Sequence, residues 1–270
     1  MRKPLVLALA MLSALAFLVS GCSSDSDGTS SSSTTESTAA TTSSASGTIL
    51  VSAAASLTDA FTTITDDFVA ANPDADVTLN FGSSGALSTQ IQEGAPADVA
   101  AFADTTPMTA LEDTGLLAGS PEIFATNQLI IVTKPGNPAG IESLADLATV
   151  GVITLCVDTA PCGKFADQVL STAGVTIPES SITRGTDVKS ALTAVSEGDA
   201  VAGIVYVTDA AAVADRVDTV DIPEVENVVA SYPIAVVTAT TSSELAQAFL
   251  DHVLSDQGQA VLKDAGFLTP

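Results

Sequence analysis

Four segments of the sequence place small or hydroxyl-bearing residues between a predicted strand and a predicted helix. They lie at residues 53–57, 81–85, 160–164 and 185–189. The first N–H groups of a helix have no partner inside the helix, and the helix dipole adds a partial positive charge at that end. Helix starts therefore bind anions without the help of a cation. If the four segments meet in the fold, they form a site for a small anion.

Ser56 and Ser84 bring hydroxyl groups to the first two segments. Ser56 precedes a helical pattern and is followed three residues later by Asp59, which is close to a capping box. It is therefore either a helix cap alone or a cap whose own proton still points into a cleft. Ser84 lies in the glycine-rich turn 82–85, which can expose several N–H groups in one concavity. An ordinary surface turn is the alternative for Ser84.

Cys162 and Val188 would contribute backbone N–H groups. Each lies at the start of a predicted helix, where these groups have no partner inside the helix. Thr186 or Asp187 is the predicted cap of the helix that begins at Val188. An Asp187 carboxylate that faced the cleft would repel a fully ionised oxyanion and favour one that carries a proton.

Tyr206 ends the buried apolar run 203–205. It is either a core tyrosine with a satisfied hydroxyl or a phenol that faces a ligand. Its position at the end of a predicted strand favours the second interpretation.

Lys164 lies in the first turn of the third predicted helix, where the helix dipole disfavours a cation. A bound anion would offset this cost. An ion pair with Asp158 or Asp167 is the simpler explanation, and we expect that pair.

The elements that position these residues follow from hydrophobic periodicity. Apolar runs typical of strands lie at residues 48–51, 77–81, 99–102, 129–132, 152–157, 203–207 and 234–237. Strands that are apolar on both faces belong to parallel sheets covered by helices. Helical stripes between them, such as Leu57, Phe61 and Ile64, predict the covering helices. The fold class is α/β with mostly parallel sheets, in which ligands bind beyond the carboxyl ends of the strands.

The charge balance excludes several partners. Eight Lys and Arg against 32 Asp and Glu give a net charge of -24, so the chain has no basic surface for nucleic acid or anionic lipid. With one His and three Cys, neither a histidine-built metal site nor a histidine-based catalytic triad is expected. No acid–base pair or nucleophile stands out, so we predict no enzyme and no cofactor. An extracytoplasmic enzyme or a sensor on the same fold is the distant alternative.

The N-terminus predicts export and a lipid anchor. Residues 1–21 combine a basic start with an apolar run that is too short to span a membrane, as in a secretory signal. Residues 19–22 are similar to the bacterial lipobox, which implies lipidation of Cys22 at the outer face of the cytoplasmic membrane; an ordinary signal with an incidental Cys is the alternative. The Ser- and Thr-rich stretch 22–46 cannot bury enough surface to fold and is predicted to be a flexible tether.

Cys156 and Cys162 remain for the exported domain. In an oxidising compartment a disulfide is expected, and over so short a loop it would mainly shape that loop. A reactive thiol pair is the alternative, but its usual Cys-x-x-Cys spacing is absent.

Several segments together resemble the molybdate-binding proteins of bacterial ABC transporters, which have the type II periplasmic binding fold. The similar segments are residues 53–58, 94–99, 203–206, 232–237 and 266–267, in the same order and with the same spacing.

The resemblance implies an oxyanion site with no counter-charge. Ser56 and Ser84 would donate from hydroxyls and amides, Cys162 and Val188 from amides, and Tyr206 from its phenol. Molybdenum would be bound only as molybdate, through these same residues. The sequence departs from the family at Cys162, where a small residue is usual, and at Gly85, where a hydroxyl residue is common.

The resemblance also implies two lobes and a set of partners. Lobe 1 would comprise residues 47–129 plus 233–270 and lobe 2 residues 130–232, with crossing strands at 129–132 and 232–237. The protein would act as a monomer that captures molybdate, and also tungstate, for an ABC permease and its ATPase. A receptor for sulfate or another tetrahedral oxyanion is the alternative.

Overall fold

The N-terminal half of the described chain builds a small parallel sheet. The structure is a computed structural model that describes residues 45–270, so the predicted signal peptide, Cys22 and nearly all of the tether lie outside the described residues. The central strand β1 (Gly47–Ala54) pairs in parallel with β2 (Ala75–Gly82) and with β3 (Val99–Ala101).

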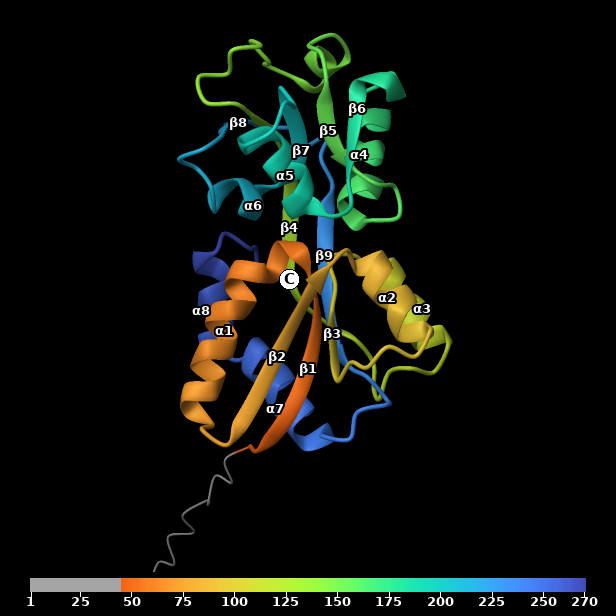
Figure 1. The fold of residues 1–270 in the computed structure, drawn as a ribbon, viewed down its shortest axis with the longest axis vertical. Coiled ribbons are helices and arrows are strands. Elements are labelled where there is room, and N and C mark those ends of the chain that lie inside the picture. Colours follow the sequence, from red (N-terminus) through yellow and green to blue (C-terminus); the bar gives the residue numbers. More distant parts are fainter. Residues whose placement is uncertain (1–44) are drawn as a thin grey trace, which may run out of the picture. The chain divides into compact units, whose positions relative to one another are not determined.

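Helices cover both faces of this sheet (Figure 1). One face is covered by α1 (Thr58–Ala71), α7 (Ser243–Leu254) and α8 (Asp256–Asp264). The other is covered by α2 (Ser84–Gln92) and α3 (Thr105–Asp113), which enclose a second apolar cluster. We call these strands and helices lobe 1.

A second group of elements, lobe 2, repeats this plan. Its strand β5 (Ile153–Cys156) pairs in parallel with β6 (Ile182–Gly185) and β7 (Ala202–Tyr206), and the short β8 lies at Asp218–Val220. Its helices are α4 (Pro161–Thr172), α5 (Val188–Ser196) and α6 (Val207–Ala211). Short 3-10 turns lie at Ala55–Leu57, Leu144–Ala148 and Glu179–Ser181.

Two long strands connect the lobes. β4 (Glu122–Thr133) pairs first with β9 (Val229–Val236) and then, over residues 129–133, with β7. β9 in turn pairs with β3, which gives the strand order β2-β1-β3-β9-β4-β7-β5-β6, with β8 beside β4. Every antiparallel pairing between two strands in the described residues involves β4 or β9.

The predicted α/β class is confirmed, and the sheet is mixed rather than mostly parallel because of the two connecting strands. β4 begins at Glu122, earlier than the predicted 129, because its first half carries the polar residues Thr126 to Gln128 and so lacks an apolar run. β6 was missed for the same reason, since it contains Arg184. The predicted lobe boundaries stay a prediction, because Ser43–Pro270 forms one compact unit whose main apolar core runs through both lobes.

Candidate anion-binding site

The helix starts that were predicted to bind an anion surround one cavity between the lobes. Its lining includes all five predicted ligand residues, which are Ser56, Ser84, Cys162, Val188 and Tyr206. Within this cavity, the space open to the centre of a water-sized sphere is about 10 Å³. This is room for roughly one such sphere. The cavity therefore suits a small compact ion and excludes larger solutes.

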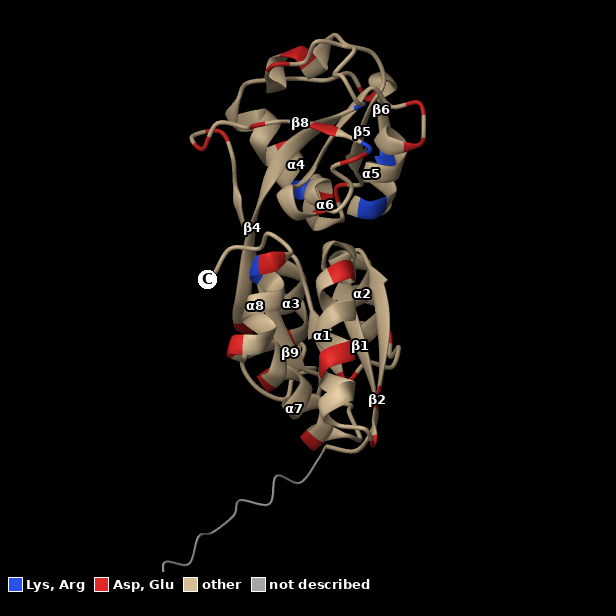
Figure 2. Cartoon of the chain, turned by 90° about the vertical axis from the view of Figure 1, so that its left-hand side faces the viewer, with Lys and Arg blue, Asp and Glu red and all other residues tan. Residues whose placement is uncertain are grey.

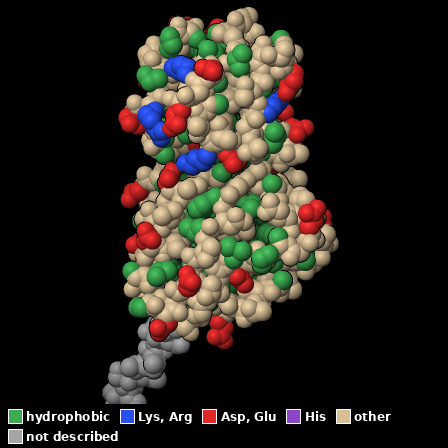
Figure 3. Space-filling view, viewed as in Figure 1, with side chains coloured by type: hydrophobic (Ala, Val, Ile, Leu, Met, Phe, Trp, Pro, Cys, Tyr) green, Lys and Arg blue, Asp and Glu red, His purple; other side chains and the backbone are tan. Residues whose placement is uncertain are grey.

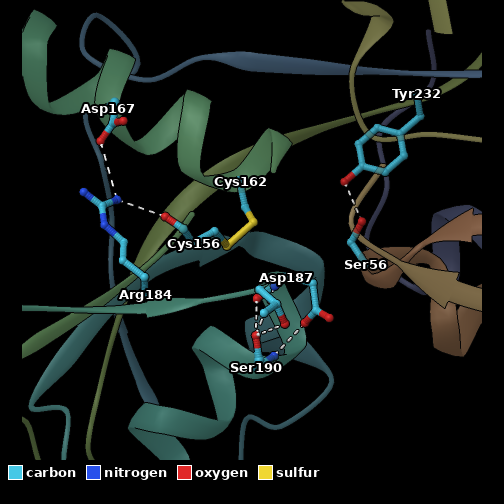
Figure 4. Close-up of a disulfide and its surroundings, with 9 residues drawn as sticks. Ser56, Cys156, Cys162, Asp167, Arg184, Asp187, Ser190 and Tyr232 are labelled. Carbon is cyan, nitrogen blue, oxygen red and sulfur yellow. Dashed lines mark hydrogen bonds and ion pairs between the residues drawn. A yellow bond between two sulfur atoms is a disulfide. The ribbon is translucent and has the colours of Figure 1, made fainter. Parts of the chain in front are cut away.

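Ser56 lies in the 3-10 turn Ala55–Leu57 that precedes α1, and its side chain caps neither helix. The expectation that Ser56 is a helix cap is therefore wrong, because the tight turn moves the start of α1 to Thr58. The Ser56 Oγ instead lies 2.9 Å from the Oη of Tyr232, a hydrogen bond that joins the turn to β9 (Figure 4).

Ser84 is the first residue of α2 and is almost completely buried. Its Oγ accepts a hydrogen bond of 3.0 Å from the Ala103 N–H. Because a hydroxyl that accepts one bond still has its own proton, Ser84 remains a donor for a ligand.

Cys162 is the second residue of α4 and Val188 the first residue of α5. Their N–H groups have no acceptor within these helices. Pro161, the first residue of α4, has no N–H, so Cys162 supplies the first one of that helix. The predicted sources of backbone donors thus lie at the cavity.

Asp187 also lines the cavity and is the cap of α5. Its Oδ1 accepts a hydrogen bond of 2.8 Å from the Ser190 N–H (Figure 4). The carboxylate is therefore engaged by the backbone at the start of α5 as its cap.

The predicted disulfide between Cys156 and Cys162 is present in the structure. It ties the end of β5 to the first turn of α4 (Figure 4). Arg184 also fixes the end of β5, because its Nη1 donates to the Cys156 carbonyl oxygen at 2.9 Å. The loop that presents the Cys162 amide is thus fixed from two sides.

Tyr206 ends β7 with only 1% of its surface exposed, and its Oη has no hydrogen-bond partner among the described residues. Burial raises the pKa of the Tyr206 phenol well above its usual value, so the hydroxyl keeps its proton at neutral pH. A buried hydroxyl with no partner at the cavity wall is suited to donate to a ligand.

The cavity lining contains no Lys or Arg, although two lysines bridge the lobes beside it. Lys164 Nζ of α4 lies 2.6 Å from Asp104 Oδ2 and 2.7 Å from Thr106 Oγ1, both in lobe 1. The expected pairing of Lys164 with Asp158 or Asp167 is therefore wrong, because lobe 1 comes close enough to supply the partner.

Lys189 of α5 forms the second bridge. Its Nζ lies 2.8 Å from Asp59 Oδ2 in lobe 1 and 3.4 Å from Asp209 Oδ1 in lobe 2. Burial lowers the pKa of Lys189, but Asp209 and Asp59 outweigh it and the pKa is raised. Burial raises the pKa of Asp209 to about 7, against the opposing effect of Lys189.

Positively charged residues are divided unevenly between the lobes. Of the Lys and Arg in the described residues, only Lys263 of α8 lies in lobe 1, while lobe 2 carries the others. Figures 2 and 3 show this division, with the Lys and Arg residues gathered on the upper lobe and at its junction with the lower one. The two lysine bridges thus join single lysines on α4 and α5 of lobe 2 to acidic side chains of lobe 1.

Within residues 45–270, no group of three or more His, Cys, Asp or Glu side chains could hold a metal ion. In the same residues, no helix has the length and apolar character needed to cross a membrane.

Sequence reasoning does not find the residues that bond to the hydroxyls of the cavity. Ala103 bonds to Ser84, and Tyr232 to Ser56. Asn127, which is 1% exposed in β4, lies beside Tyr232. Tyr232 was named only as part of a similar segment, and no sequence pattern identifies Asn127.

Comparisons with known proteins agree with this geometry. The model of the bacterial extracellular solute-binding proteins matches residues 49–268. The molybdate-binding protein ModA of Mycobacterium tuberculosis (strain H37Rv) is 41% identical over 203 residues, which are 74% of this chain and 77% of that protein.

Solved structures show the same fold. The periplasmic molybdate-binding protein of Azotobacter vinelandii has a TM-score of 0.75 at 22% identity, with 82% of this chain and 99% of that chain covered. The sulfate-binding protein SubI of Mycobacterium tuberculosis has a TM-score of 0.74 at 20% identity, with 82% and 86% covered, so the fold alone does not distinguish the anion. The resemblance seen in the motifs is confirmed by the sequence matches, and the chain belongs to the bacterial extracellular solute-binding proteins and, within them, to the molybdate-binding proteins.

Proposed function

We propose that the protein captures molybdate, and also tungstate, in this cavity and delivers it to an ABC importer. The observation that carries the proposal is a small cavity between two lobes that presents hydroxyls and helix starts but no cation. The name of the Mycobacterium tuberculosis relative supports molybdate as the ligand.

The proposed roles follow from the geometry of each group. Ser56, Ser84 and Tyr206 donate from hydroxyls, and the N–H groups of Cys162 and Val188 complete the shell. Because the lobes exclude water, each of these bonds acts on the dianion in a medium of low dielectric constant and is stronger than at an exposed surface. A shell made of donors favours fully deprotonated oxyanions over hydrogen phosphate, whose proton needs an acceptor.

The protein acts as a monomer without catalysis, and a permease with its ATPase receives the anion. Lipidated Cys22 holds it at the outer face of the cytoplasmic membrane, where two or three acyl chains suffice for a stable anchor.

Thermal unfolding with different anions tests the proposed ligand. For protein that begins after Cys22, molybdate or tungstate at 1,000 times the dissociation constant should stabilise the fold by ~4 kcal/mol. Sulfate and phosphate at the same concentration should stabilise it much less, phosphate because its proton needs an acceptor that a shell of donors lacks. A stabilisation by sulfate equal to that by molybdate would identify a general sulfate-type receptor, and no response to molybdate would refute the function.

Replacing Cys22 by Ser tests the anchor. The variant should appear in the soluble extracytoplasmic fraction, whereas the unmodified protein should sediment with membranes. Membrane association that persists in Cys22→Ser would contradict the anchor and leave the binding function untouched.

A further inference from the structure

A buried hydroxyl stands directly behind Ser56. Tyr232 of β9 is 0% exposed and is absent from the cavity lining, yet its Oη lies 2.9 Å from the Ser56 Oγ. In the described residues this is the single hydrogen bond of the Ser56 side chain. Whether Ser56 can donate to a ligand therefore depends on which of the two hydroxyls donates in this bond.

Asn127 favours Tyr232 as the donor in this bond. Its Oδ1 accepts a hydrogen bond of 2.9 Å from the Gln128 N–H, which turns its NH₂ group toward the buried hydroxyls. The Nδ2 lies 2.8 Å from Thr208 Oγ1 and 3.5 Å from Tyr232 Oη. An amide NH₂ can only donate, so it faces the acceptor side of the Tyr232 hydroxyl.

With a donor on its acceptor side, the Tyr232 hydroxyl has its own proton free for Ser56, its neighbour at 2.9 Å. Burial raises the pKa of the Tyr232 phenol, so this proton is present throughout the neutral range. The Ser56 Oγ then accepts from Tyr232, and the Ser56 proton is left to point into the cavity.

The Ser84 hydroxyl is also left with its proton free, but a backbone group takes the place of Tyr232. Its acceptor side is filled by the Ala103 N–H at 3.0 Å, and a backbone amide can only donate. Both serines are thus polarised as donors, Ser84 by main chain and Ser56 by the side chains of Tyr232 and Asn127.

We propose that Tyr232 is a positioning residue for anion binding, which fixes the Ser56 hydroxyl as a donor and so disfavours ligands that would need an acceptor there. This inference rests on the proposed function of the cavity and adds a residue that does not touch the ligand. Without the Tyr232 hydroxyl, Ser56 is free to rotate, and its orientation must be fixed during binding.

A double-mutant cycle on molybdate affinity tests the role of Tyr232. By calorimetric titration, Tyr232→Phe should weaken binding by about tenfold, the worth of one hydrogen bond of ordinary strength. In a Ser56→Ala background the same substitution should have no further effect, because its target is gone. In a Ser84→Ala background, the matched control, the tenfold loss should persist.

The outcomes separate this inference from the function on which it rests. A wild-type protein that does not bind molybdate refutes the proposed function. A wild-type protein that binds, together with a Tyr232→Phe variant of unchanged affinity, overturns only the role of Tyr232. An equal loss in the Ser56→Ala background also overturns it, since a merely structural role would weaken binding in every background.

Asn127 provides a second variant in case Tyr232→Phe does not fold. Asn127→Ala keeps the tyrosine but removes the donor that orients it. Its loss of molybdate affinity should be smaller than tenfold and should again disappear in the Ser56→Ala background. A loss that remains in that background would overturn the proposal.

Discussion

Replacing both Ser56 and Ser84 by Ala is expected to weaken molybdate binding by about 100- to 10,000-fold. A hydrogen bond to a charged group contributes about 1.5–3 kcal/mol, and each 1.4 kcal/mol is a factor of about ten in affinity. Both side chains line the cavity. Ser84 accepts a hydrogen bond from the Ala103 N–H, and Ser56 is hydrogen-bonded to the Tyr232 hydroxyl. Their loss therefore removes two donors that no rearrangement of the wall replaces. Calorimetric titration with molybdate measures the effect.

Ser88→Ala is the matched control for this double variant. Ser88 lies in the same helix as Ser84, is 2% exposed and donates to the Pro107 carbonyl oxygen at 2.8 Å, away from the cavity. Its replacement should lower stability without changing molybdate affinity. If Ser56→Ala with Ser84→Ala bound molybdate as the wild type does, the two serines would not be ligands.

Gly85→Ala is expected to prevent the lobes from closing. A Cβ on Gly85 would overlap the carbonyl oxygen of Thr159 in lobe 2, a backbone atom that no side-chain rotation can move. Overpacking of this kind costs about 1–3 kcal/mol, so affinity should fall by about 10- to 100-fold. Since Ala is a better helix former than Gly within α2, the ligand-free protein should be as stable as before or more so.

Two measurements on the same samples distinguish this mechanism from damage to the fold. Small-angle scattering should show that molybdate fails to compact Gly85→Ala, while the melting temperature without ligand stays equal or rises. Gly119→Ala is the control, because a Cβ there meets open space. Normal affinity in Gly85→Ala would mean that the lobes bind the anion without this contact.

The sequence predicts the residues of the site more completely than the strands and helices around it, for a physical reason. Helix starts that follow strands leave a local pattern of small and hydroxyl residues, so Ser84 and Val188 were found from neighbours in the sequence. The role of Tyr232 depends on a bond across 176 residues, and nothing near Tyr232 in the chain signals it.

The predictions that the structure contradicts also depend on contacts between distant residues. Neighbours in the sequence predict the wrong partner for Lys164, because its partners lie about 60 positions away on the other lobe. Ser56 fitted a local capping pattern, yet the 3-10 turn and the Tyr232 hydroxyl decided its environment. The polar first half of β4 was missed because it is held by pairing with β9 rather than by its own apolar pattern.

The lysine bridges between the lobes affect how the affinity for the anion responds to ionic strength. Lys164 and Lys189 bridge the lobes through groups that lie outside the cavity lining, so they contribute to the fraction of unliganded molecules that is closed. The apparent affinity is the intrinsic affinity scaled by that fraction. Partly exposed ion pairs are screened by salt, whereas bonds inside a buried cavity are much less so. Ionic strength would thus act on the conformational equilibrium of an anion receptor whose binding shell contains no cation.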